Sequence, residues 1–112
     1  MMIEQLATVT TETSNGTLIA RITGELDGSN VKDIGDKIIA AGSDARACVA
    51  DLTLVTYLDS AALTMLHRLA QQSAALHLVT PAGSRAARLV EIGGLDTVLR
   101  THETVEDALA GI

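Results

Sequence analysis

The sequence predicts an α/β domain with a mixed, four- to five-stranded sheet, an N-terminal hairpin and about four helices. Two observations carry this prediction. An Asn-Gly pair separates two strand-like segments, and apolar strands then alternate with amphipathic helices along the rest of the chain. Such alternation is typical of a largely parallel sheet with helices packed against it. The 112 residues contain no linker, repeat or low-complexity tract, so residues 1–112 are expected to form one domain.

The predicted hairpin joins strands over residues 6–11 and 17–23. Asn15 and Gly16 lie between them, and both residue types tolerate the positive φ that a tight hairpin turn requires. Apolar residues alternate with polar ones in the second strand, so one face of this strand is expected to be buried. The run Gly-Glu-Leu-Asp-Gly at residues 24–28 is rich in turn formers and ends the strand.

Four helices are expected from apolar residues at helical spacing. Good N-cap residues precede or begin each of them: Ser29, Ser60, Ser84 and Thr104. The first helix is expected to end at Gly42, the second near residue 74, and the third at Gly93-Gly94. The apolar stripes of the four helices would face the sheet.

Three further strands are expected between the helices. Residues 47–52 and 76–80 are nearly continuous apolar runs, as expected for strands that are covered on both faces. Residues 54–58 are expected to extend the first of these runs irregularly. Val98 and Leu99 are expected to form a short last strand.

The composition excludes several classes of partner. The formal net charge of −6 and the isoelectric point near 4.8 argue against binding a nucleic-acid backbone or an anionic membrane surface. Tyr57 is the only aromatic residue, so the chain offers no stacking platform for bases. Residues 1–5 lack the features of a signal peptide, and no apolar stretch reaches the roughly 20 residues that span a bilayer. With Cys48 as the single cysteine, we expect a cytoplasmic protein.

Three carboxylates, those of Asp27, Asp51 and Asp59, are expected where strands leave the sheet. This edge is where α/β proteins usually place their sites. One interpretation is a Mg²⁺ site for phosphoryl transfer, and another is helix capping and turn formation. No lysine stands near these positions, and no glycine-rich phosphate loop precedes a helix. We therefore expect neither a metal nor a cofactor.

The remaining candidates for chemistry are dispersed. His67, His77 and His102 share no spacing suited to metal ligation and are expected on a helix, a strand and a loop respectively. Cys48 lies in an apolar strand without an adjacent base, which predicts a buried, inert thiol. Nothing resembles an assembled nucleophile, base and oxyanion hole, so the sequence predicts no catalytic residue and favours a protein that is not an enzyme.

Ser60 is the residue at which a modification is expected. It begins an apolar helix, and a serine there normally serves as the N-cap. The same position suits a phosphoacceptor, because a phosphate would face free backbone N–H groups and the positive end of the helix dipole. The phosphate would add about −1.5 to −2 charges beside Asp59 and repel a partner that docks an apolar or acidic patch there. The residues alone leave both interpretations open.

Three segments together resemble the signature of STAS domains, in particular of the bacterial anti-sigma factor antagonists. They are Gly24-Glu25-Leu26-Asp27, Asp51-Leu52, and Val55-Thr56-Tyr57-Leu58-Asp59-Ser60-Ala61-Ala62-Leu63. The resemblance extends over nearly the whole chain, because the later strand ending at Pro81 and the Gly93-Gly94-Leu95 run also fall in the order of the family. It implies a sheet with helices mainly on one side.

The resemblance also implies a switch in partner exchange. In that family the unphosphorylated antagonist binds an anti-sigma factor and so releases the sigma factor to direct transcription. The anti-sigma factor is often a Ser/Thr kinase that phosphorylates and dismisses the antagonist, and a phosphatase restores it. By this resemblance the phosphoacceptor corresponds to Ser60, the preceding acid to Asp59 and the turn acid to Asp27. ATP would belong to the kinase.

The expected contact surface comprises Asp27, Asp59, Ser60, Ala61, Thr64 and His67. The family usually has Ser or Thr and then Gly where this chain has Ala61 and Ala62, so the Ala62 methyl group is expected where a partner approaches the backbone. One alternative is a non-phosphorylated subunit of a transporter or of a sensory scaffold complex. A second is a phosphoryl-transfer or nucleotide-binding protein that uses the three aspartates. A weak homodimer also stays open.

Overall fold

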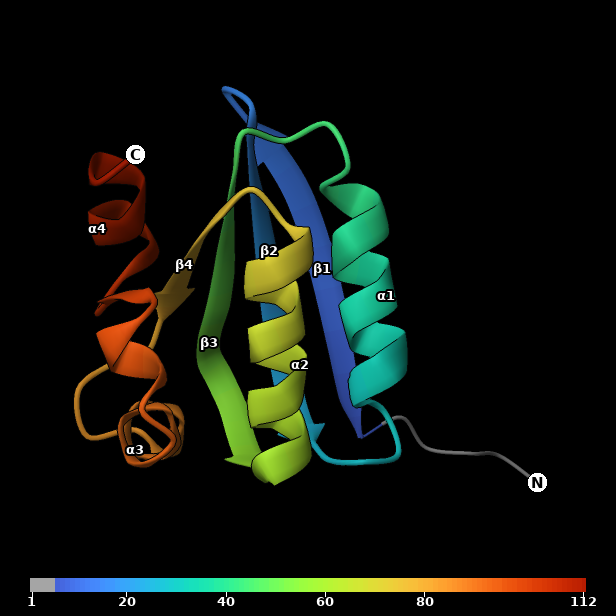
Figure 1. Ribbon diagram of the computed structural model, residues 1–112, viewed down its shortest axis with the longest axis vertical. Coiled ribbons are helices and arrows are strands. Elements are labelled where there is room, and N and C mark those ends of the chain that lie inside the picture. The colour runs from blue at the N-terminus through green and yellow to red at the C-terminus, as the bar shows by residue number, and fades with distance from the viewer. Residues whose placement is uncertain (1–5) are drawn as a thin grey trace.

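A five-stranded sheet in the order β1-β2-β3-β4-β5 forms the centre of the computed structural model, which describes residues 6–112 (Figure 1). β1 pairs antiparallel with β2, and the later neighbours pair in parallel, so the predicted mixed sheet is confirmed. The strands are β1 (Ala7–Ser14), β2 (Thr17–Leu26), β3 (Ala47–Leu58), β4 (Ala75–Val79) and β5 (Arg100–His102). The helices are α1 (Val31–Ala41), α2 (Ser60–Gln72), α3 (Arg85–Ile92), the 3₁₀ turn η1 (Leu95–Thr97) and α4 (Val105–Ala110). Residues 1–5, which are not expected to form a signal peptide, lie outside the described residues.

The hairpin turns where the sequence predicts it. Asn15 and Gly16 have φ angles of 51° and 80°, so both occupy the left-handed region that a two-residue hairpin turn needs. Both strands are longer than expected, because pairing continues from Ser14 back to Ala7 and from Thr17 on to Gly24. The first three residues of the run at 24–28 therefore form the end of β2, and its last two, Asp27 and Gly28, lie in the turn that follows.

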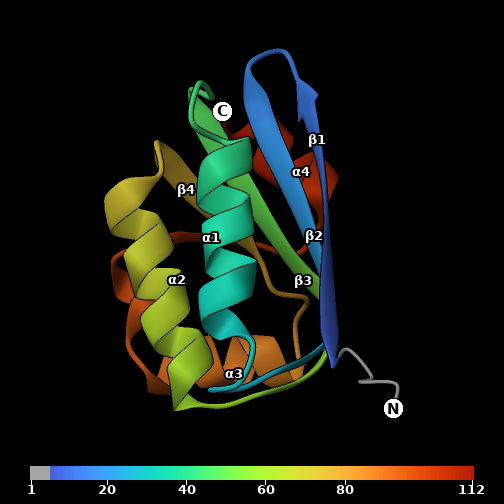
Figure 2. The same ribbon diagram turned by 90° about the vertical axis from the view of Figure 1, so that its right-hand side faces the viewer.

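The two faces of the sheet are covered unequally. One face packs against α1, α2 and α3, and its buried side chains form the main core. Buried leucine and isoleucine side chains from β2, α1 and α2 meet there, among them Leu18, Ile22, Ile38, Leu66 and Leu69. The other face packs against α4 through a small cluster around Val49 and Ala108. Figure 2 shows α1 and α2 side by side on one face of the sheet and α4 on the other, so the expectation of helices mainly on one side is confirmed.

The second half of β3 extends the strand irregularly, as predicted. Residues 54–58 continue β3, which runs from Ala47 to Leu58. Its last residues keep their hydrogen bonds to β2 across two register shifts, whereas β4 pairs only with residues 47–51. Asp51 is consequently a mid-strand residue, and the prediction that it lies where a strand leaves the sheet is wrong.

The last strand is also displaced from its predicted position. Val98 and Leu99 lie in a turn after η1, because their N–H groups both donate to the carbonyl of Leu95, at 3.1 and 2.8 Å. The strand follows as Arg100–His102, so the prediction that His102 lies in a loop is wrong. After α3 ends at Gly93-Gly94, these local hydrogen bonds place the start of the last strand at Arg100.

Two helix boundaries need smaller corrections. α1 begins at Val31 with Asn30 in the N-cap position, whereas Ser29, the predicted cap, bonds back to Asp27. α2 ends at Gln72, two residues before the predicted end. Ser84 and Thr104 cap α3 and α4 as predicted, with their hydroxyls accepting the N–H groups of residues 87 and 107 at 3.0 Å.

Candidate functional site

The candidate site forms where two neighbouring parallel strands end. Leu26 and Leu58, the last residues of β2 and β3, are paired in the sheet, and the Asp59 N–H donates to the Leu26 carbonyl at 3.3 Å. Asp27 and Asp59 therefore follow directly from two paired residues, and α2 starts immediately after the second. The structure thus brings Asp27, Asp59 and Ser60 together at one edge of the sheet, as predicted.

Asp59 caps α2, and the interpretation of Ser60 as the N-cap is wrong. The Asp59 backbone is extended, with φ −116° and ψ −169°, and its carboxylate accepts the Ala61 N–H at 2.9 Å. Aspartate and serine are about equally good N-cap residues, so their preferences do not choose between Asp59 and Ser60. The N-cap is the last residue with an extended backbone before the helix, and here that residue is Asp59. Ser60 is the first helical residue and is exposed. Among the hydrogen bonds within residues 6–112, none uses its hydroxyl.

Asp27 is held in a tight turn after β2. Its carboxylate accepts the Ser29 N–H at 2.8 Å and also the Ser29 hydroxyl. These two bonds, the hydroxyl foremost, hold the pKa of the Asp27 carboxyl below its usual range. Asn30 braces the turn, with its amide donating to the Glu25 carbonyl at 2.8 Å and its oxygen accepting the Asp27 N–H at 3.1 Å. The site therefore presents a fixed negative charge beside the start of α2.

The exposed stripe of α2 continues from Ser60. Thr64 lies one turn further along and donates its hydroxyl to the Ser60 carbonyl at 3.3 Å, and His67 follows on the same side; both are exposed. Ala61 is half-buried. Ala62 is wholly buried in the main core, so its methyl group does not stand where a partner approaches, and that expectation is wrong.

The three predicted aspartates do not form one site. Asp51 lies midway along β3 and accepts hydrogen bonds from the N–H and hydroxyl of Thr53, at 3.0 and 2.5 Å. Within residues 6–112 there is no group of three or more His, Cys, Asp or Glu side chains that could hold a metal ion. Capping accounts for the hydrogen bond of Asp59 and turn formation for those of Asp27, whereas Asp51 bonds to Thr53 within β3.

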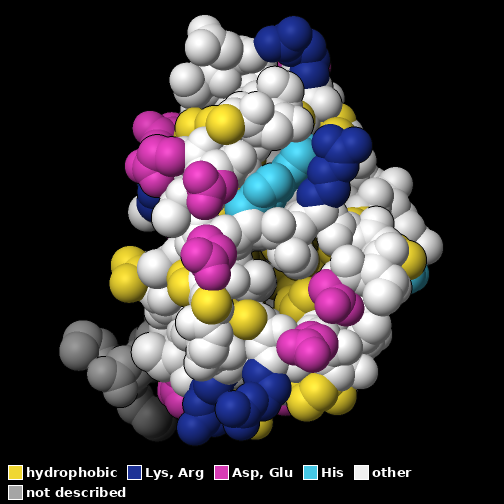
Figure 3. Space-filling model, turned by 90° about the vertical axis from the view of Figure 1, so that its left-hand side faces the viewer, with side chains coloured by type: hydrophobic (Ala, Val, Ile, Leu, Met, Phe, Trp, Pro, Cys, Tyr) yellow, Lys and Arg dark blue, Asp and Glu magenta, His cyan; other side chains and the backbone are white. Residues whose placement is uncertain are grey.

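The sequence interpretation missed a pair of stacked histidines. His77 of β4 is buried, and its Nδ1 lies 2.9 Å from Nε2 of His102, with ring centroids 5.1 Å apart. The parallel register that sets Val79 against His102 brings the two together, although 25 residues separate them. Figure 3 shows histidine atoms (cyan) at the surface of this face, with acidic side chains (magenta) nearby. A hollow measures about 450 Å³, and its lining includes His102 and the acidic residues Glu91, Asp96, Glu103 and Asp107.

Cys48 behaves as the sequence predicts. It is 2% exposed in β3, and burial raises the pKa of its thiol to about 11. A thiol with such a pKa is almost wholly protonated at neutral pH and is a poor nucleophile. The prediction of a buried, inert cysteine is confirmed.

The comparison with known families agrees with this arrangement of strands and helices. The family model described as STAS domain matches residues 8–108. The chain belongs to the STAS domain family. No curated protein sequence gives a significant match to it. No helix within residues 6–112 of this STAS domain is long and apolar enough to cross a membrane.

Solved structures share its fold. An anti-sigma factor antagonist from Mycobacterium paratuberculosis superposes with a TM-score of 0.85 at 24% identity, over 95% of this chain and 93% of that one. The unphosphorylated form of the anti-sigma factor antagonist SpoIIAA superposes with a TM-score of 0.69 at 21% identity, over 94% of this chain and 100% of that one. The phosphorylated form of SpoIIAA, described as a Bacillus cell fate determinant, superposes with a TM-score of 0.64 at 19% identity, over 92% of this chain and 97% of that one.

Proposed function

We propose that this STAS domain is an anti-sigma factor antagonist. It binds an anti-sigma factor, often a serine kinase, through the surface around Ser60, and it thereby regulates transcription that depends on a sigma factor. Phosphorylation of Ser60 switches the binding off. The observation that carries the proposal is the Ser60 hydroxyl, which is exposed at the first turn of α2 beside Asp59, the N-cap of the helix.

The local geometry suits a reversible phosphate. The Ser60 hydroxyl makes no hydrogen bond within the described residues, so its modification breaks no structural contact. The positive end of the α2 dipole stabilises the added charge. The fold should therefore survive phosphorylation, and the change should act at the surface alone.

The same geometry makes the phosphate effective against a partner. A phosphate brings about −1.5 to −2 charges to a surface that already carries the carboxylates of Asp27 and Asp59. Asp59 already accepts the Ala61 N–H, so the phosphate adds its charge directly beside a carboxylate at the same helix terminus. A partner that tolerates two negative charges there meets about four after phosphorylation, and its docked acidic or apolar groups are repelled.

Affinity capture from the lysate of the native host tests the proposal. The baits are the wild-type protein, Ser60→Asp and a matched control, Ser43→Asp. Ser43 is also exposed, in the turn after α1, at the far end of the helix pair from Ser60 (Figure 2). We expect the wild type and Ser43→Asp to retain a kinase-type anti-sigma factor that Ser60→Asp loses, and incubation of the purified pair with ATP should phosphorylate Ser60.

The measurement that follows is the affinity for the purified partner. Ser60→Asp should weaken binding by at least about tenfold, which corresponds to about 1.4 kcal/mol, while its Tm stays within a few degrees of the wild type. Retention of the same partners by all three baits would contradict the switch. Capture of a transporter subunit or of a sensory scaffold by all three would favour the non-phosphorylated alternative.

A further inference from the structure

A groove runs between α1 and α2, beside the Ser60 surface. It encloses about 280 Å³, and its lining includes the apolar side chains of Val31, Ala61 and Met65. Lys32 of α1 and Arg68 of α2 also line it. The groove therefore combines an apolar lining with two cations, on a chain whose formal net charge is −6.

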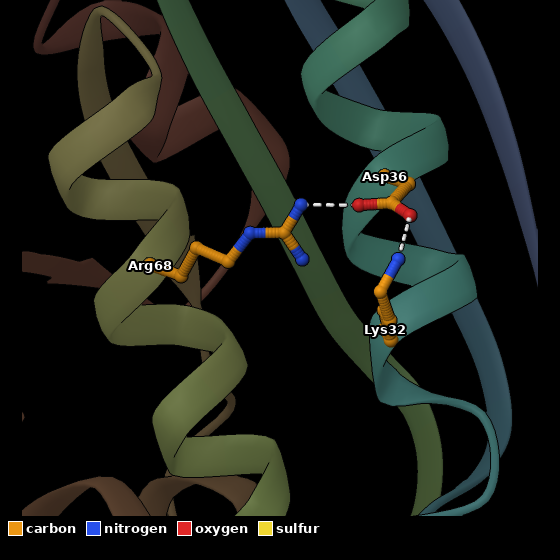
Figure 4. A network of polar contacts seen from close by, with 3 residues as sticks. All are labelled: Lys32, Asp36 and Arg68. Atoms are coloured by element: carbon orange, nitrogen blue, oxygen red, sulfur yellow. Dashed lines mark hydrogen bonds and ion pairs between the residues drawn. The ribbon is translucent and has the colours of Figure 1, made fainter.

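Asp36 of α1 fixes both cations. Its two carboxylate oxygens bind Lys32 Nζ, at 3.0 Å, and a terminal nitrogen of Arg68 (Figure 4). These contacts, that of Arg68 foremost, hold the pKa of the Asp36 carboxyl below its usual range. With one carboxylate between two cations, the network keeps a net charge of +1 at the groove.

The guanidinium of Arg68 retains donors for a ligand. Arginine has five N–H donors, and only one terminal nitrogen of Arg68 bonds to Asp36 among the described residues. In Figure 4 the other terminal nitrogen points into the space between the two helices. Gly35 leaves room for this position of the Arg68 guanidinium, because a Cβ at residue 35 would lie 3.1 Å from Arg68 Nη1 and 3.3 Å from Met65 Cγ.

We propose that this groove receives a helical segment of the partner protein, in which an apolar side chain is flanked by aspartate or glutamate. The inference rests on the proposed function and assigns the partner chemistry that the Ser60 surface recognises. The apolar side chain of the partner segment packs against Val31 and Met65 in the groove. The carboxylate of the partner segment binds Arg68 and Lys32. Charge-assisted hydrogen bonds of arginine to carboxylates are among the strong ones, so this pair supplies specificity.

The groove also explains how the modification reaches the partner. Thr64 lines the groove and lies one helical turn from Ser60 on the same stripe. Neighbours at this spacing have Cβ atoms about 5–6 Å apart. A phosphate on Ser60 would thus lie beside the bound carboxylate and oppose the attraction of Lys32 and Arg68. Acidic partner chemistry and a phosphate switch are therefore consistent with each other.

The first experiment needs no identified partner. A short helical peptide with two leucines one turn apart and two adjacent glutamates is titrated into ¹⁵N-labelled protein. A second peptide has glutamine at both glutamate positions, and octanoate serves as a non-peptide probe. We expect the acidic peptide to shift the amides of Val31, Ala61, Thr64 and Met65 and the glutamine peptide to bind at least about tenfold more weakly.

Two variants separate a binding role of the cations from a structural one. Arg68→Gln and Asp36→Asn break the same ion pair, but only the first removes a cation. We expect Arg68→Gln to lower the affinity for the acidic peptide at least about tenfold and Asp36→Asn to raise it. If both variants weaken binding alike, the ion pair is structural and the proposal is overturned. Binding of octanoate without binding of the acidic peptide overturns the assignment of a protein segment.

The same variants in the capture experiment keep the two proposals distinguishable. If Ser60→Asp loses the anti-sigma factor while Arg68→Gln retains it at wild-type affinity, the groove assignment fails and the switch stands. If Arg68→Gln loses a partner that Ser60→Asp retains, the switch fails and the groove assignment is supported.

Discussion

The Asp59 carboxylate accepts the backbone N–H of Ala61 at 2.9 Å, so the capping residue of α2 is the neighbour of Ser60 and not Ser60 itself. The two adjacent side chains therefore divide two tasks. One holds the helix terminus, and the other lies exposed on the surface with its hydroxyl unused within the described residues. In a chain where Ser60 capped the helix, modification would cost a structural hydrogen bond.

This division of tasks predicts unequal effects of two alanine substitutions. Asp59→Ala should lower the free energy of unfolding by about 1 kcal/mol, because an N–H group of the first turn loses its partner. Ser60→Ala should change it by less than about 0.5 kcal/mol. Urea denaturation of both variants measures the difference. A larger loss for Ser60→Ala than for Asp59→Ala would assign the cap to the serine.

The buried methyl group of Ala62 leads to a second prediction. Ala62→Gly restores the residue that the family usually has, and it should destabilise the domain by about 1–2 kcal/mol through lost helix propensity and lost burial. Its affinity for the captured partner should remain that of the wild type, because the methyl group is 0% exposed. Tighter binding by Ala62→Gly at unchanged stability would show that the methyl group does meet the partner.

The sequence predicts most of the fold because the elements carry strong local signals. Asn15-Gly16, the four capping regions and the apolar strand runs are each decided by a few neighbouring residues. The errors concern positions that residue preferences alone do not resolve. Asp51 lies mid-strand because residues 54–58 stay paired with β2. Val98 and Leu99 lie in a turn because their N–H groups donate to the Leu95 carbonyl of η1.

The candidate site is only partly visible in the sequence. The motif around Ser60 locates the site, since Asp27 and Asp59 follow two strands that pair in parallel. The choice of Asp59 as the cap depends on one backbone conformation, which residue preferences alone do not resolve. The Lys32–Asp36–Arg68 network joins two helices across 32 residues, and the histidine pair joins two strands, so neither has a local signature.

Gly24 gives a third prediction. Its φ is +96°, and a Cβ there would lie 2.1 Å from the Leu6 carbonyl oxygen. Gly24→Ala should therefore lower the free energy of unfolding by at least about 2 kcal/mol, because backbone strain and the steric clash both destabilise the fold. Gly28→Ala is the matched control, because a Cβ at Gly28 meets nothing within 4 Å and should change stability by less than about 1 kcal/mol. Equal losses for the two variants in thermal denaturation would contradict the close approach of β1.

The buried histidine gives the last prediction, which concerns pH. Burial foremost, and then His102 and Arg100, lower the pKa of His77 from 6.5. Because the folded value lies below the unfolded one, the unfolded chain binds more protons below pH 6.5. The stability contributed by neutral His77 is complete above that pH and is lost as the pH falls, by at most about 1.4 kcal/mol per pH unit.

Urea denaturation between about pH 5 and pH 7 measures this slope. His77→Gln should reduce the slope, since the residue that gains a proton on unfolding is gone. His67→Gln should retain it, because that side chain is exposed on α2 and lies outside the stacked pair. An unchanged slope in His77→Gln would assign the acid sensitivity to other groups and would contradict the role of buried, neutral His77.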